Sequence, residues 1–155
     1  MEMKIKGLAV PYNVQNAYGE ILLPNAFDVF LREWLASKKP LKMKAGHKVT
    51  IGQWTAFANK PKGLYLIGTI EDAEIIDILS DVEDGKQAID FFGLSISYGD
   101  LGDGSLKSRL LRSAILDLNR GMQLHKKIIV KNASLNEVSI TPDPAFPGTW
   151  IRKCG

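Results

Sequence analysis

Apolar and polar residues alternate over short segments of this chain, and this pattern predicts mostly strands. In the first such segment Lys4 and Lys6 alternate with Ile5 before the sequence becomes apolar. The segments hold many β-branched and aromatic residues and are separated by Gly, Pro and Asn. The predicted strands are Met3 to Val10, Ile21 to Leu23, Ile51 to Phe57, Leu64 to Ile70, Phe91 to Tyr98, Lys127 to Lys131 and Ala133 to Thr141. A hairpin turn is predicted at Asn59 to Gly63, where Pro61 and Gly63 favour a turn.

Three further segments carry apolar residues at helical spacing. The first helix is expected to begin with Asn25 as N-cap and to end before Pro40, the second to span about Ala73 to Glu83, and the third to run from a Ser105 cap to Gly121. The apolar residues at helical spacing are Phe27, Phe30, Leu31, Trp34 and Leu35 in the first, Ile75, Ile78, Leu79 and Val82 in the second, and Leu111, Ile115 and Leu118 in the third. The sequence therefore predicts a mainly β protein with flanking helices (α+β), in which about three helices surround a single β-barrel or curled sheet.

Composition narrows the class of protein without choosing a function. A length of 155 residues fits one domain, and a net charge of +3 is too small to indicate a nucleic-acid binder. The single cysteine, Cys154, excludes an internal disulfide framework and favours a reducing compartment. The N-terminus resembles no signal peptide, and no apolar run is long enough to span a membrane. We therefore expect a protein of the cytoplasm, with no membrane partner.

Motifs for metal or phosphate binding are missing from the sequence, so neither a metal nor another cofactor is expected. His47 and His125 lie far apart, and no HExxH, CxxC, GxxxxGK[ST] or GxGxxG pattern occurs. Lysines gather around His47, but the interleaved aromatic residues of a nucleic-acid surface do not accompany them. These lysines, Lys38, Lys39, Lys42, Lys44 and Lys48, are read as a solvated rim.

Nucleophilic catalysis is the more informative possibility. A serine nucleophile needs a base within hydrogen-bond distance, and His47 and His125 are the two histidines that could serve. In GLSISYGD, a strand would place Gly93, Ser95 and Ser97 on one face, which would let a peptide approach the backbone closely. The same small residues could instead pack under a helix, and the pattern alone leaves both interpretations open.

Five blocks of the sequence, taken in order, resemble the prohead maturation proteases of tailed phages. The first is GLAVPYNVQNAYGEILLPNAF, from Gly7 to Phe27. It is followed by His47 with IGQW, by GLYLIGTI, by GLSISY and finally by LNEVSITPDPAF, which ends at Phe146. Each block is weak alone, but their order over most of the chain makes the resemblance specific.

The resemblance implies a fold shared with the herpesvirus assemblins and a serine endopeptidase that cleaves scaffold and capsid subunits during phage head maturation. Transferred by motif, Ser95 is the nucleophile, His47 the general base and Glu137 the acid that orients the histidine. The implied substrates are the phage major capsid protein and scaffold, and the implied location is the bacterial cytoplasm inside the assembling prohead. Residues 1–155 would form one prohead-protease domain with a helical insertion at about 105–121. The resemblance does not decide whether the protein cleaves itself or forms an oligomer.

Alternatives exist for the nucleophile, for the third residue of the triad and for the function. Ser97 stands where the family usually has Gly, so it is the second candidate for the nucleophile. His125 is the second candidate for the third member, because assemblins use a second histidine there. A different class of function is a non-catalytic capsid-assembly or scaffold module that retains the same fold. Binding of nucleic acid through the lysines around His47 is a third reading.

Overall fold

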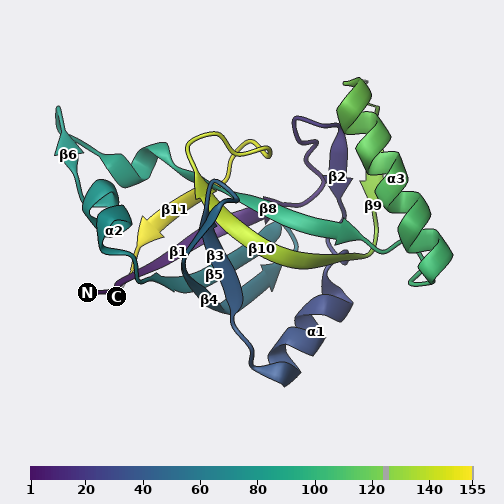
Figure 1. Ribbon diagram of the computed structural model, residues 1–155, viewed down its shortest axis with the longest axis horizontal. Coiled ribbons are helices and arrows are strands. Elements are labelled where there is room, and N and C mark those ends of the chain that lie inside the picture. Colours follow the sequence, from purple (N-terminus) through teal and green to yellow (C-terminus); the bar gives the residue numbers. More distant parts are fainter. Residues whose placement is uncertain (124–125, 155) are drawn as a thin grey trace.

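A curled sheet is the centre of the molecule, seen in a computed structural model that describes residues 1–123 and 126–154 (Figure 1). Its strands follow the order β11-β1-β5-β4-β3-β10-β8. The bounds of these strands are β1 Met3–Pro11, β3 Leu41–Ala45, β4 Val49–Lys60, β5 Gly63–Ile70, β8 Gly93–Asp100, β10 Ala133–Thr141 and β11 Trp150–Lys153. Two small sheets accompany it, one of β2 (Glu20–Leu22) with β9 (Ile128–Val130) and one of β6 (Val82–Glu83) with β7 (Lys86–Gln87).

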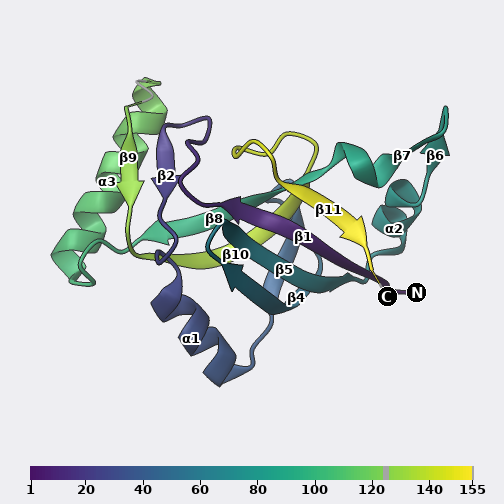
Figure 2. The same ribbon diagram turned by 180° about the vertical axis from the view of Figure 1, so that it is seen from behind.

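Three α-helices lie around the sheet: α1 (Asp28–Ser37), α2 (Ala73–Leu79) and α3 (Leu106–Met122). A short 3-10 helix, η1 (Ala88–Phe91), precedes β8. Helix α3 lies beside β2 and β9 at one end of the molecule, and α2 with the β6–β7 hairpin is at the other (Figures 1 and 2). The predicted α+β class, a curled sheet surrounded by about three helices, is confirmed. Among the described helices, none combines the length and apolar composition that crossing a bilayer requires.

The sheet curls until its two ends approach each other over one apolar core. Leu94 of β8 lies so close to β1 that a Cβ added to Gly7 would come within 2.7 Å of the Leu94 Cδ1 atom. The same Cβ would lie 2.5 Å from the backbone carbonyl oxygen of Trp150, so glycine at position 7 leaves room for β11 beside β1 as well as for the Leu94 side chain. Across the interior, the buried Trp54 indole of β4 donates a 3.1 Å hydrogen bond to the carbonyl oxygen of Val138 in β10. The core thus fixes β10 from inside the curled sheet.

Strand β10 is the centre of the arrangement that matters for function. It pairs with β3 in parallel and with β8 in antiparallel, so it lies between them. Its predicted bounds are confirmed. A β-bulge interrupts its register with β8 between Leu135 and Glu137. On a regular strand Leu135, Glu137 and Ser139 would share one face, but Leu135 belongs to the same buried core cluster as Val138. The bulge changes the alternation and turns Glu137 away from the face that Leu135 occupies.

Other expectations about the elements need correction. Strands β3, β6, β7 and β11 were not predicted. Helix α2 ends at Leu79, before the predicted Glu83, and Val82–Glu83 form β6. Asn25 is not the N-cap of α1: Phe27 holds that position and makes no side-chain capping bond. Ser105 does cap α3, since its hydroxyl accepts a 3.1 Å hydrogen bond from the backbone N–H of Ser108. The tail is also ordered, because the N–H of Cys154 donates to the carbonyl oxygen of Lys4.

The predicted apolar stripes of the helices are only partly buried. Within α1, Leu31 and Trp34 face the core while Leu35 is 69% exposed. In α3, Leu111 and Leu118 are likewise exposed. The buried side of α3 is formed by Leu116 and Asn119, because the helix packs on the edge of β8 and on β9 with a partly polar face.

Candidate active site

Ser95 lies in β8, the edge strand of the sheet that is held by β10. Its register partner across the strands is Ser139. The Oγ atom of Ser95 lies 2.9 Å from Nε2 of His47. Because β8 has no further strand on its outer side, its backbone groups there are free to pair with an extended peptide beside Ser95.

His47 lies in the tight turn between β3 and β4. The turn is closed by the N–H of Lys48, which donates to the carbonyl oxygen of Ala45. Both central residues have positive φ, 56° at Gly46 and 62° at His47. Positive φ at both central positions is typical of the type I′ turns that join antiparallel strands. A non-glycine residue at positive φ is uncommon and is found mostly where the surroundings hold it in place.

Glu137 lies directly after the bulge in β10 and is 7% exposed. Its Oε1 atom makes a short hydrogen bond with Nδ1 of His47. Its Oε2 atom accepts a 2.9 Å hydrogen bond from the hydroxyl of Ser139. Both carboxylate oxygens therefore have partners, which a buried acidic group requires. His47 is less enclosed, with 41% of its side chain exposed.

The hydrogen bonds define one tautomer of His47. An ionised carboxylate can only accept, so Nδ1 of His47 carries the proton that is donated to Glu137. Nε2 is then left as the acceptor for the hydroxyl proton of Ser95. This is the arrangement in which a neutral imidazole can remove a proton from a serine while a carboxylate stabilises the imidazolium that forms.

The structure thus brings together all three residues that were chosen from the sequence. It also bears on the alternatives. Ser97 pairs in register with Glu137, but in the part of the chain that the structure describes no hydrogen bond joins it to His47. Ser95 is therefore the serine that the geometry favours. His125 lies outside the described residues. Glu137 is the residue that bonds Nδ1 of His47.

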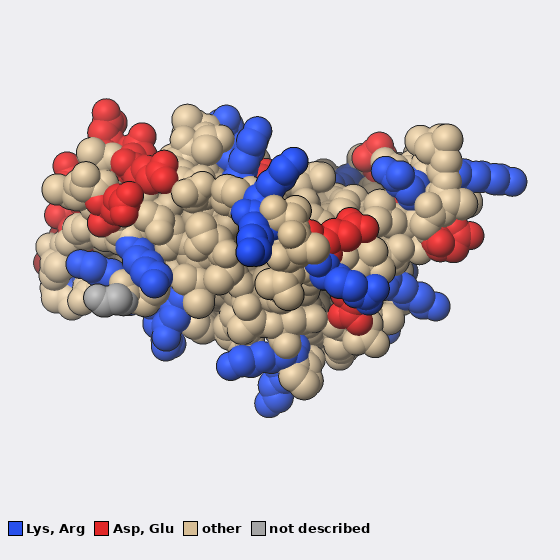
Figure 3. All heavy atoms as spheres, turned by 90° about the horizontal axis from the view of Figure 1, so that it is seen from below, with Lys and Arg blue, Asp and Glu red and all other residues tan. Residues whose placement is uncertain are grey.

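A pocket of about 790 Å³ opens over these residues. Beyond Ser95, His47 and Glu137, its wall includes the side chains of Lys42 and Lys44 from β3. Acidic residues gather elsewhere: residues 71–90, which include α2 and the β6–β7 hairpin, contain eight of them and one lysine. Figure 3 shows Asp and Glu side chains gathered at this end of the molecule, whereas Lys and Arg side chains, with a few acidic ones among them, are spread over the rest of that face. The lysines predicted to be a solvated rim therefore include two that line the pocket.

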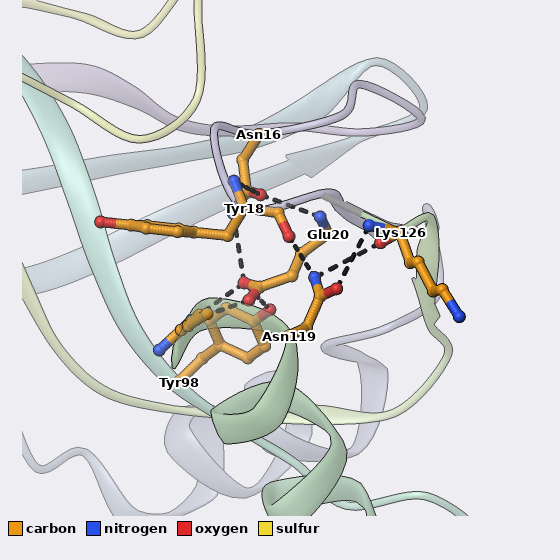
Figure 4. A network of polar contacts seen from close by, with 7 residues as sticks. Asn16, Tyr18, Glu20, Tyr98, Asn119 and Lys126 are labelled. Atoms are coloured by element: carbon orange, nitrogen blue, oxygen red, sulfur yellow. Dashed lines mark hydrogen bonds and ion pairs between the residues drawn. The ribbon is translucent and has the colours of Figure 1, made fainter. Parts of the chain in front are cut away.

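The far wall of the pocket is a polar network centred on the buried Glu20 (Figure 4). Arg120 of α3 donates to both Glu20 oxygens, at 2.8 Å and 2.9 Å. The Tyr98 hydroxyl donates to Oε1 of Glu20 at 2.5 Å, and the Asn16 side-chain amide donates to the same atom at 3.2 Å. The network joins α3 to β8 and to the Asn16–Glu20 loop. Local sequence patterns do not indicate this network, because Glu20 and Arg120 are 100 positions apart.

The network shifts the pKa values of Tyr98 and Arg120 in the direction that keeps their protons. Burial raises the pKa of the Tyr98 hydroxyl, and the nearby negative charge of Glu20 raises it further. The hydrogen bonds to Glu20 raise the pKa of the Arg120 guanidinium, although its partial burial acts in the opposite direction. Glu20 therefore keeps a neutral phenol and a cationic guanidinium beside it. Within residues 1–123 and 126–154, no group of three His, Cys, Asp or Glu side chains is placed to hold a metal ion.

Comparison with solved structures identifies proteins with a similar fold. A crystal structure of KSHV protease in complex with a hexapeptide phosphonate inhibitor matches with a TM-score of 0.59 at 13% identity, over 100% of this chain and 66% of that chain. The fold is that of the assemblin proteases. This chain therefore spans about two thirds of the length of the KSHV protease, and the 13% identity speaks for the fold alone.

Two other herpesvirus structures match less well. The Kaposi's sarcoma-associated herpesvirus protease with an allosteric inhibitor has a TM-score of 0.42 at 12% identity, covering 98% of this chain and 75% of that one. The varicella-zoster virus protease has a TM-score of 0.38 at 12% identity, covering 90% of this chain and 64% of that one. No protein-family model matches the chain, and no curated protein sequence does.

Ser139, too, was assigned no role from the sequence. Ser139 contacts both His47 and Glu137, and it belongs to the block LNEVSITPDPAF that supplied Glu137. Its place in that block was the available signal. The hydrogen bonds of Ser139 could not be predicted, because the residue pattern does not indicate the bulge that precedes Glu137 in β10.

Proposed function

We propose that this protein is a serine endopeptidase that cleaves scaffold and capsid subunits during the maturation of a phage head. The observation that carries the proposal is the continuous chain of hydrogen bonds from Ser95 through His47 to Glu137. The assemblin fold supports peptide-bond hydrolysis as the reaction. The five ordered blocks that resemble prohead proteases support the phage role and the two substrates.

In the proposed reaction, Nε2 of His47 removes the hydroxyl proton as Oγ of Ser95 attacks the scissile carbonyl carbon. The protonated imidazole then gives that proton to the leaving amine, and an acyl-enzyme remains on Ser95. Water attacks the acyl-enzyme in the second half, with His47 again acting first as base and then as acid. Glu137 keeps the imidazole in the required tautomer and stabilises its positive charge throughout.

The test is to incubate the purified protein with its cognate major capsid protein and scaffold and to measure the intact masses of all components. We expect new fragments with the wild-type protein and none with Ser95→Ala. Ser97→Ala is the matched control, because it removes a hydroxyl from the same strand and leaves the Ser95–His47 bond in place. Fragments that persist with Ser95→Ala, or that are absent with the wild-type protein, would contradict the proposal.

The non-catalytic capsid-assembly module remains the competing function. It predicts that the protein binds capsid or scaffold protein and leaves their masses unchanged. The same incubation distinguishes the two functions, because stable binding with intact masses favours the module.

A further inference from the structure

Ser139 is a buried hydroxyl that touches two members of the proposed triad at once. The residue is 0% exposed and lies in β10, two positions after Glu137. Its Oγ atom accepts a 2.9 Å hydrogen bond from the backbone N–H of His47 and donates one of 2.9 Å to Oε2 of Glu137. The hydroxyl has a single proton, and the carboxylate can only accept, so the direction of both bonds is fixed.

The bond to His47 holds the turn that carries the base. The turn's own closing bond uses the N–H of Lys48, so it leaves the N–H groups of Gly46 and His47 to find partners elsewhere. Both find them in β10: Gly46 donates to the carbonyl oxygen of Ile140, and His47 donates to the hydroxyl of Ser139. Because His47 has a positive φ, its backbone relies on such contacts to stay in this conformation.

The bond to Glu137 holds the acid. One carboxylate oxygen is taken by Nδ1 of His47 and the other by Ser139, so the plane of the carboxylate is fixed at both ends. The bulge immediately before Glu137 interrupts the regular pairing of β10 with β8 there. A side-chain anchor from the next regular part of the strand compensates for that interruption.

We propose that Ser139 is a positioning residue, whose hydroxyl sets the geometry between His47 and Glu137 and thereby the activation of Ser95. The inference rests on the proposed function and deepens it. Ser139 is not part of the pocket wall and reaches no substrate, so it acts through the base and the acid alone. Its loss should therefore slow the chemical step and leave binding unchanged.

The experiment follows the labelling of Ser95 by a fluorophosphonate probe, which needs no knowledge of the natural substrate. In this reaction a bond forms between Oγ of Ser95 and phosphorus, fluoride leaves, and His47 takes the hydroxyl proton. Intact-mass measurement at several probe concentrations separates the maximal labelling rate from the probe concentration at half-maximal rate. Hydrogen exchange of the His47 backbone amide, followed by NMR, reports the contact itself.

Three variants are compared with the wild-type protein. Ser139→Ala removes the hydroxyl, and Ser139→Cys keeps the size and the single donor but makes a weaker hydrogen bond. Ser134→Ala is the matched control, because Ser134 is a partly buried serine of the same strand that lines no part of the pocket. We expect Ser139→Ala to lower the maximal labelling rate by about tenfold to a hundredfold, as small misplacements of catalytic groups do. Ser139→Cys should fall between it and the wild type, and Ser134→Ala should match the wild type.

In the supporting result the half-maximal concentration stays unchanged in Ser139→Ala, while the His47 amide exchanges faster than in the wild type. The inference is overturned if the wild-type protein is labelled at Ser95 and Ser139→Ala is labelled at the same rate. A wild-type protein that is not labelled at all contradicts the proposed function, and with it the catalytic part of this inference. Amide exchange of His47 that is equal in Ser139→Ala and the wild type overturns the contact independently of activity.

Discussion

Oγ of Ser95 and Nε2 of His47 lie 2.9 Å apart, although 48 positions separate the two residues in the chain. The two residues do not lie on neighbouring strands. Ser95 is in β8 and His47 follows β3, and β10 lies between these strands and pairs with both. The distance between the Ser95 hydroxyl and the His47 imidazole is therefore set by β10, which also supplies Glu137 and Ser139.

Replacing Ser95 by Ala should abolish cleavage and labelling, with a loss on the order of 10⁶ in turnover as for other triad serines. The protein should stay folded, because the side chain lies at the wall of the pocket and only one hydroxyl is lost. Labelling followed by intact mass checks this, with Ser97→Ala as the control. If Ser97→Ala loses activity and Ser95→Ala keeps it, the assignment of the nucleophile is wrong.

Replacing Glu137 by Gln should lower turnover by about 10⁴, because the amide can no longer hold the tautomer of His47 that accepts from Ser95. The substrate concentration at half-maximal rate should change little, since Glu137 lies behind the histidine. Steady-state kinetics on a cleaved peptide measures both quantities. Unchanged turnover would mean that another group orients the base, and His125→Ala would then be the next variant to measure.

Replacing Arg120 by Ala should lower the free energy of unfolding by about 2–3 kcal/mol, because it leaves the buried carboxylate of Glu20 without its cation. The expected loss is below that for a fully enclosed pair, since 42% of the Arg120 side chain is exposed. Urea denaturation followed by circular dichroism gives the value. Arg109→Ala, an exposed residue of the same helix, is the control and should change stability by less than about 0.5 kcal/mol.

Tyr98 should make stability depend on pH in the alkaline range. Burial, reinforced by the charge of Glu20, raises the pKa of Tyr98 above its usual value of 10.0. The folded protein thus keeps the phenol proton to a higher pH than the unfolded chain does. The stabilising contribution is complete below about pH 10 and declines at about 1.4 kcal/mol per pH unit as the pH rises toward the folded pKa.

The variant Tyr98→Phe removes this titration, so its free energy of unfolding should decline less steeply than that of the wild type between about pH 10 and 11. Urea denaturation at a series of pH values compares the two slopes. Tyr12, whose pKa burial also raises, titrates in both proteins and therefore cancels in the comparison. Equal slopes for the two proteins would show that Tyr98 does not titrate differently in the folded state.

The sequence predicted well wherever one local signal decided the structure. Strand β10 has the bounds that its residue pattern indicates, and Ser105 caps α3 as a serine before a helical segment should. Strand β3 was missed although Lys42 and Lys44 alternate with Leu41 and Met43, which is the period of a strand. The charges there were read as a solvated surface, whereas the strand buries its apolar face and turns its lysines toward the pocket.

Features that depend on contacts between distant residues could not be predicted from the sequence, for a physical reason. The bulge beside Glu137 depends on how β10 fits β8, and the pairing of Glu20 with Arg120 depends on where α3 lies on the sheet. Neither the bulge nor the Glu20–Arg120 pair can be predicted from a few neighbouring residues. The exposed Leu35 is a similar case, because helical periodicity predicts a shared face but not how wide a part of that face the sheet covers.

The place of β10 after β3 and β8 in the chain has a consequence for synthesis. A ribosome completes β3, its turn and β8 well before it adds residues 133–141. Until then the growing chain contains Ser95 and His47 but lacks the strand that holds them side by side, and Glu137 and Ser139 do not yet exist. The nascent chain therefore cannot form the hydrogen-bonded arrangement of Ser95, His47 and Glu137 until it has been made through Thr141.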